Sequence, residues 1–63
     1  MCEVNAYLLG QKGETEIMKE VDLMDIQGND IVFRDLLGRE AHVKGTIKAV
    51  DFGKHRVTVE ETP

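Results

Sequence analysis

Glycine divides this sequence into short segments, and that spacing limits what the chain can fold into. The glycines are Gly10, Gly13, Gly28, Gly38, Gly45 and Gly53. The apolar stretches between them have the typical length of strands. Glycine and asparagine tolerate positive φ, so Gly28-Asn29-Asp30 is a favourable hairpin connection. The spacing therefore predicts an all-β chain with tight turns.

Six segments are predicted as strands. In the first of them, alternation places Cys2, Val4, Ala6 and Leu8 on one face, as expected for a strand with one buried side. The segments are residues 2–9, 23–27, 31–35, 41–44, 46–51 and 56–60, with a further short strand expected near residues 16–19. Strands this short and numerous favour a small SH3-like or Sm-like barrel of five to six short antiparallel strands, in one domain spanning residues 1–63.

Residues 14–27 admit two interpretations. Ile17, Val21 and Met24 recur at helical spacing behind an acidic start, which is compatible with a helix. The β-rich segments on both sides favour instead a short strand at residues 16–19, followed by another from Val21. Strand or helix therefore stays open for residues 14–20.

A chain of this length is expected to have only marginal stability. It has 63 residues, and a domain of this size buries only about 60% of the surface that its unfolded chain exposes. Disulfides, metals or association usually compensate. The single cysteine cannot form an intramolecular disulfide. We therefore expect a homodimer, a bound metal, or both.

Composition excludes several functional classes. No apolar stretch approaches the roughly 20 residues that cross a bilayer, and the first residues lack the pattern of a signal peptide, so we expect a cytoplasmic protein without a membrane partner. The sequence contains no Ser-His-Asp order, phosphate-binding glycine loop or CxxC pair, so we do not expect an enzyme.

Nucleic-acid binding is disfavoured by charge. The net charge is −4, whereas affinity for phosphates comes mainly from cationic side chains. The loose basic group of Lys44, Lys48, Lys54 and Arg56 lies among carboxylates, and the aromatic residues are too separated for a base-stacking platform. We therefore expect no RNA partner.

Cys2 is the one residue with distinctive chemistry. In one interpretation it is a small buried side chain of the first strand. In the other it is a metal ligand, because a thiolate next to a main-chain nitrogen forms a chelate at the start of the chain. Two copies of Cys2 meeting across a two-fold axis would supply two sulfur and two nitrogen donors, a set that suits square-planar Ni(II) or Cu(II).

The two histidines lack a metal-binding pattern. His42 is expected to be exposed on a strand, and His55 lies in a predicted turn between Lys54 and Arg56. Neither forms an HxH or HExxH motif, so we do not expect either to bind the metal.

The order of residues along nearly the whole chain resembles the CooT family of small nickel-binding proteins. The similarity lies in Met1-Cys2-Glu3, Gly13-Glu14, Ile17-Met18-Lys19-Glu20-Val21, Gly28-Asn29-Asp30-Ile31-Val32, Asp35-Leu36-Leu37-Gly38, Val43-Lys44-Gly45-Thr46-Ile47 and His55-Arg56-Val57-Thr58-Val59-Glu60. The Met-Cys start is the most specific of these elements.

The resemblance implies a cytoplasmic homodimer of small β-barrels that binds Ni(II) at the subunit interface through Cys2 of each chain. It also implies a metallochaperone role for carbon monoxide dehydrogenase or another nickel enzyme, or for its maturation proteins. Without a histidine-rich tail, delivery or sensing is expected rather than storage. Some members are labelled predicted RNA-binding proteins, so the alternative is a small RNA-binding or adaptor module in which Cys2 is only structural.

Overall fold

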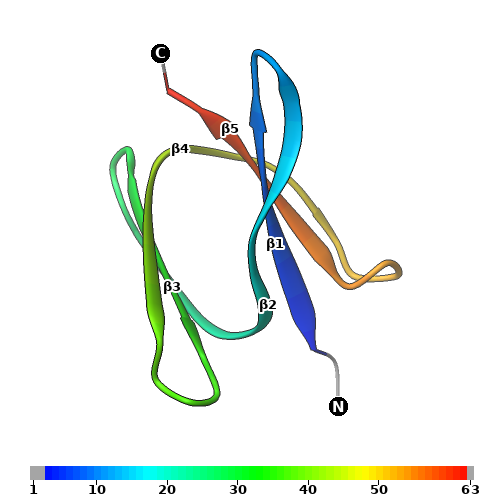
Figure 1. Cartoon of the computed structure of the whole chain (residues 1–63), viewed down its shortest axis with the longest axis vertical. Coiled ribbons are helices and arrows are strands. Elements are labelled where there is room, and N and C mark those ends of the chain that lie inside the picture. The colour runs from blue at the N-terminus through cyan, green and yellow to red at the C-terminus, as the bar shows by residue number, and fades with distance from the viewer. Residues whose placement is uncertain (1–2, 63) are drawn as a thin grey trace.

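The computed structural model describes residues 3–62, which form a closed five-stranded barrel (Figure 1). The strands are β1 (Val4–Gly10), β2 (Gly13–Gln27), β3 (Asp30–Asp35), β4 (Glu40–Asp51) and β5 (Arg56–Glu61). The all-β barrel is therefore confirmed, and residues 14–20 are strand rather than helix. The described part of the chain contains no helix long and apolar enough to cross a membrane.

The barrel closes between its first and last strands. Each strand pairs with the next one antiparallel, and β5 then returns to pair with β1 in parallel, from Asn5 opposite Arg56 to Leu9 opposite Glu60. A parallel pair needs a long crossover connection. Here the path through β2, β3 and β4 supplies it, so one ladder joins the first strand to the last.

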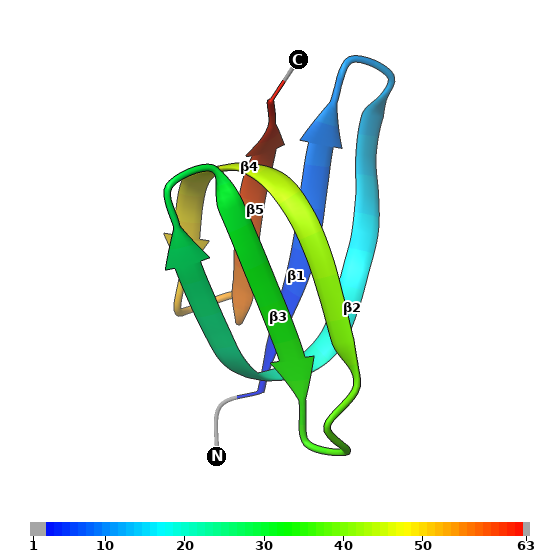
Figure 2. The ribbon, with the colours of Figure 1, turned by 90° about the vertical axis from the view of Figure 1, so that its left-hand side faces the viewer.

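Two long, bent strands replace four of the short predicted segments. β2 runs for 15 residues and β4 for 12. The first half of β2 pairs with β1 and its second half with β3, while β4 passes from β3 to β5 in the same way (Figure 2). The predicted segments are thus correct as strands, and the expected breaks between them are bends.

Each bend coincides with a contact to a neighbouring strand. In β2, Glu20 adopts a positive φ of 55°, and its amide donates a hydrogen bond of 3.1 Å to Oδ1 of Asn5. In β4, Gly45 brings its backbone against β5, where a Cβ would collide with the carbonyl oxygen of Glu60. A bend in each long strand lets a short chain close a barrel.

The core comes from the three shorter strands. Its fully buried apolar side chains are Ala6 from β1, Ile31 and Phe33 from β3, and Val57 and Val59 from β5. Val4 and Leu8 pack against this cluster, which confirms the predicted inward face of the first strand for the described residues.

Asp35 is the buried charged residue among residues 3–62, and it closes the β3–β4 turn. Its Oδ1 accepts hydrogen bonds of 2.9 Å from the amides of Leu37 and Arg39, and its Oδ2 accepts one of 2.6 Å from Nε of Arg39. Burial raises the pKa of this carboxyl, but these hydrogen bonds and the Arg39 charge outweigh burial, so the pKa lies below its ordinary value of 3.8.

We predict that Gly45→Ala destabilises the barrel. The added Cβ would meet both the Glu60 carbonyl and the buried Val59 side chain, and overpacking of this kind lowers the free energy of unfolding by about 1–3 kcal/mol. Urea denaturation measures the effect. Gly53→Ala is the control, because the nearest atom to its Cβ is Oδ1 of Asp51 at 3.5 Å. Equal stability of the two variants would contradict the close approach.

We also predict that Asp35 makes stability depend on acid. Its pKa is lower in the folded than in the unfolded chain, so its contribution is present above the unfolded pKa and disappears as pH falls through the folded pKa. Asp35→Asn should therefore destabilise the protein at neutral pH, with a difference from wild type that shrinks below pH 3.8. Urea midpoints across this range measure it. Asp30→Asn, at an exposed carboxylate, is the control, and a pH-independent difference for Asp35→Asn would contradict the assignment.

Candidate functional site

The start of the chain carries the predicted metal ligand. Cys2 lies outside the described residues, so the candidate site is defined here by what surrounds Glu3 and Val4, the described residues that follow it directly. Val4 begins β1 and is held between Val21 of β2 and the β5 side of the barrel.

An apolar groove of about 210 Å³ opens beside Val4. We call this groove the seam. It is lined by residues from all five strands and from the β4–β5 turn, namely Val4, Val21, Asp22, Leu23, Met24, Phe33, Val50, Phe52 and Val57. Phe33 and Val57 belong to the buried core. The seam is therefore a place where the core of the barrel reaches the surface.

Strand pairing explains why the seam stays open. In the described chain, residues 23–27 of β2 pair with β3 and with no other strand. Met24 lies opposite Phe33, and Val50 lies opposite Val57, so both are in line with core residues. They are nevertheless 36% and 43% exposed, because no strand covers them.

Phe52 completes the rim of the seam from the β4–β5 turn. Its side chain is 79% exposed, although phenylalanine is among the residues that gain most from burial. Leu23, on the opposite side, is also exposed. Contiguous exposed apolar surface of this kind marks interaction sites on small proteins. The seam thus exposes apolar side chains beside Val4, which is two residues after Cys2 in the sequence.

The histidines lie where the sequence predicted. His42 is exposed on β4, with its Nε2 3.4 Å from Oε1 of Glu40. His55 lies in the β4–β5 turn at a φ of 54°. Among residues 3–62, no group of three His, Asp or Glu side chains comes together as metal ligands.

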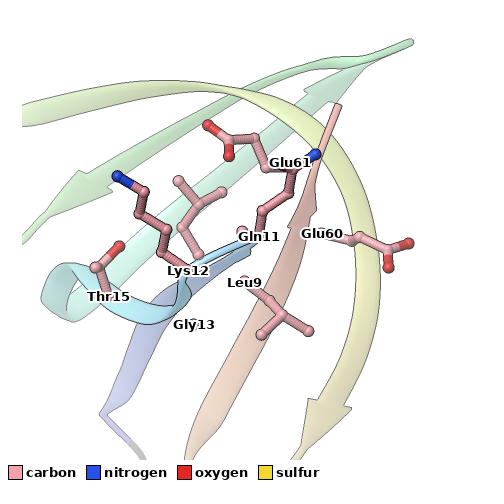
Figure 3. Close-up of a pocket in the computed structure, with 9 residues that line it drawn as sticks. Leu9, Gln11, Lys12, Gly13, Thr15, Glu60 and Glu61 are labelled. Atoms are coloured by element: carbon pink, nitrogen blue, oxygen red, sulfur yellow. The ribbon is translucent and has the colours of Figure 1, made fainter. Parts of the chain in front are cut away.

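A larger open hollow, of about 910 Å³, lies at the other end of the barrel, between the β1–β2 hairpin and β5 (Figure 3). Glu60 and Glu61 both line it, but they point to opposite sides of β5, with Glu60 on the side of Leu9. The two carboxylates therefore do not converge as an acid–base or metal-binding pair.

The predicted basic group is partly occupied by ion pairs. Arg56 contacts Oε1 of Glu14 at 2.5 Å and lies over the ring of Tyr7, 4.1 Å from its centroid. Lys44 lies 3.6 Å from Oδ1 of Asp30. Two of the four cations are thus directed to carboxylates of the same molecule.

Sequence reasoning did not identify the seam. Leu23 and Met24 are adjacent in β2, and adjacent residues of a strand point to opposite faces. Leu23 and Met24 therefore cannot both face the core of a small barrel. That adjacency, together with Phe52 in a turn, was the available signal.

The chain is similar to known proteins in sequence and in fold. A protein of Methanocaldococcus jannaschii, described as uncharacterized, is 27% identical over 60 residues, which cover 95% of this chain and 98% of that protein. The crystal structure of a protein assigned as CooT from Carboxydothermus hydrogenoformans superposes with a TM-score of 0.86 at 21% identity, over 98% of this chain and 100% of that chain.

The family comparison covers almost the whole sequence. The model of the family described as CO dehydrogenase accessory protein CooT matches residues 1–60. This range includes Cys2, strands β1 to β4, and all of β5 except its last residue. The resemblance noted in the sequence is therefore confirmed, and this chain belongs to the CooT family of CO dehydrogenase accessory proteins.

Proposed function

We propose that this protein is a nickel-binding accessory protein that holds one Ni(II) between two copies of the chain through Cys2. The observation that carries the proposal is the apolar seam beside Val4, two residues after the only thiol of the sequence. Nickel is the cargo in this account, and a nickel enzyme such as CO dehydrogenase is its destination. Membership in a family of accessory proteins for that enzyme supports this role.

The seam supports association of two copies. Its rim residues Met24, Val50 and Phe52 are exposed in the single chain, and removing their remaining apolar surface from water would favour a complex. In a two-fold dimer, the same surface of each copy forms the interface. A dimer formed through the seam would bring the Val4 residues of both copies to the interface, and the first residues of both chains with them.

The donor chemistry fits nickel. Two thiolates and two main-chain nitrogens are strong-field donors, which favour the square-planar arrangement that Ni(II) adopts. Zinc has no electronic preference for that geometry. The side chains of residues 3–62 do not form a competing cluster of metal ligands, so the proposed site consists of Cys2 and the neighbouring main chain.

The RNA-binding alternative receives less support. The ion pairs of Arg56 with Glu14 and of Lys44 with Asp30 reduce the positive charge that a phosphate backbone would meet. Tyr7, one of the three aromatic residues, is covered by Arg56. Phe52 is exposed but stands at the apolar seam rather than in a basic groove.

We predict that wild type binds one Ni(II) per dimer and that Cys2→Ser abolishes this binding. Titration followed by thiolate-to-nickel charge-transfer absorption gives the stoichiometry, and binding should weaken as pH falls because protons compete for sulfur and nitrogen. His42→Ala is the matched control, since its side chain is exposed and belongs to no group of metal-ligating side chains among residues 3–62. Undiminished nickel affinity in Cys2→Ser would refute the proposal.

We predict that Phe52→Asp weakens the dimer at least tenfold, because it places a charge at the rim of the seam. Sedimentation equilibrium of the metal-free protein measures the dissociation constant, and tenfold corresponds to about 1.4 kcal/mol. Gln11→Asp, in the hairpin at the other end of the barrel, adds the same charge and should leave the dimer unchanged. A monomeric wild type, or equal dissociation constants for the two variants, would exclude the seam as the interface.

A further inference from the structure

Asn5 of β1 is bonded to two strained positions of the backbone. Among residues 3–62, Glu20 and His55 are the residues other than glycine with a positive φ, at 55° and 54°. Oδ1 of Asn5 accepts a hydrogen bond of 3.1 Å from the Glu20 amide, and the Asn5 amide donates one of 2.9 Å to the His55 carbonyl. Such conformations cost free energy and persist where the surroundings enforce them. Two strained positions that are distant in sequence thus meet at one residue.

Packing does not explain the strain at these two positions. The side chains of Glu20 and His55 are both exposed, so the core does not hold them. Glycine adopts a positive φ without this cost, and the chain uses it at Gly13, Gly28 and Gly38. At Glu20 and His55 the conformation is therefore set by contacts, and the contact that the two positions share is Asn5.

The first of these bonds fixes one wall of the seam. The pairing of β1 with β2 shifts its register between Val4 and Ala6, on either side of Asn5, which marks a β-bulge. Glu20 lies in β2 within this bulge. Residues 21–24, which line the seam from β2, follow it directly. We call residues 21–24 the β2 wall, and its direction is set by the bulge at Asn5.

The second bond reaches the opposite wall. His55 belongs to the β4–β5 turn, and its amide donates a hydrogen bond of 3.3 Å to the carbonyl of Phe52. Phe52 and Val50 line the seam on this side, and we call them the turn wall. Asn5 is therefore bonded to the segments that carry both walls, while it does not line the seam itself. Surfaces fixed before binding lose less entropy when they associate.

We propose that Asn5 is a positioning residue for the seam, and that its two hydrogen bonds hold the β2 wall and the turn wall in the arrangement that receives the second copy. The inference rests on the proposed function for the identity of that occupant. The bond to His55 comes from the main chain and remains in every substitution except proline. The bond to Glu20 comes from the side chain, so substitution of Asn5 tests the β2 wall.

The test is sedimentation equilibrium of the metal-free protein. We expect Asn5→Ala to raise the dissociation constant of the dimer by about fivefold or more, because both copies lose the bond that fixes the β2 wall. Asn5→Asp keeps an acceptor oxygen in the same place, so it should weaken the dimer no more than Gln11→Asp, which adds the same charge at the far end of the barrel. Amide hydrogen exchange should show protection of Glu20 in wild type and Asn5→Asp, and its loss in Asn5→Ala.

A control separates positioning from a general loss of stability. Leu8 packs against the core and lines the hollow at the other end of the barrel. Leu8→Ala should lower the urea midpoint and leave the dissociation constant of the dimer unchanged. If Asn5→Ala is unfolded, Asn5→Ser takes its place, because its hydroxyl is one bond closer to the backbone and too short to reach Glu20.

Three results would overturn this inference. They are equal dissociation constants for Asn5→Ala and wild type, an equal weakening of the dimer by Leu8→Ala, and a loss in Asn5→Asp as large as that in Asn5→Ala. If Phe52→Asp weakens the dimer and Asn5→Ala does not, this inference alone fails. A monomeric wild type would contradict both this inference and the seam dimer. A dimer that depends on Asn5 but binds no nickel would contradict the proposed function alone.

Discussion

The barrel is organised by packing around Phe33, Ile31 and Val59, the largest side chains that it buries completely. Five strands of a chain this short enclose room for few such residues, and β1, β3 and β5 supply the buried apolar core of residues 3–62. The two long strands serve to close the ring. They bend at Glu20 and Gly45, and their inward-facing side chains beyond the bends are only partly covered. The open seam is thus a consequence of closing so small a barrel.

Because the seam is open, one end of the molecule is more apolar than the other. One end holds the start of β1, the seam and the β3–β4 turn, and it exposes Phe52, Leu36 and Leu37. The other end is a polar hairpin with carboxylates that diverge. Apolar surface on a chain with a net charge of −4 favours specific association over nonspecific contact. In our account the seam serves the second copy.

The sequence predicted the barrel because turn residues and alternation are local signals. Gly28-Asn29-Asp30 formed the expected connection, and Val4, Ala6 and Leu8 faced inward as their spacing implied. The joining of residues 16–19 to 21–27 was not predictable in this way, because the bend at Glu20 depends on a side chain of β1, Asn5, which is distant in sequence. The parallel closure of β1 on β5 is likewise a property of the whole chain.

For the candidate site, the sequence indicated only a ligand chemistry, which stays a prediction. A lone thiol at position 2 indicated a soft-metal ligand without indicating what lies beside it. The seam arises from strand pairing, which alternation of apolar residues does not encode.

The most direct test of the central claim is X-ray absorption at the nickel K-edge on the nickel-loaded protein. Our account predicts a four-coordinate planar nickel with two sulfur and two nitrogen neighbours. A nickel with a single sulfur neighbour, or with only oxygen and nitrogen ligands, would contradict it.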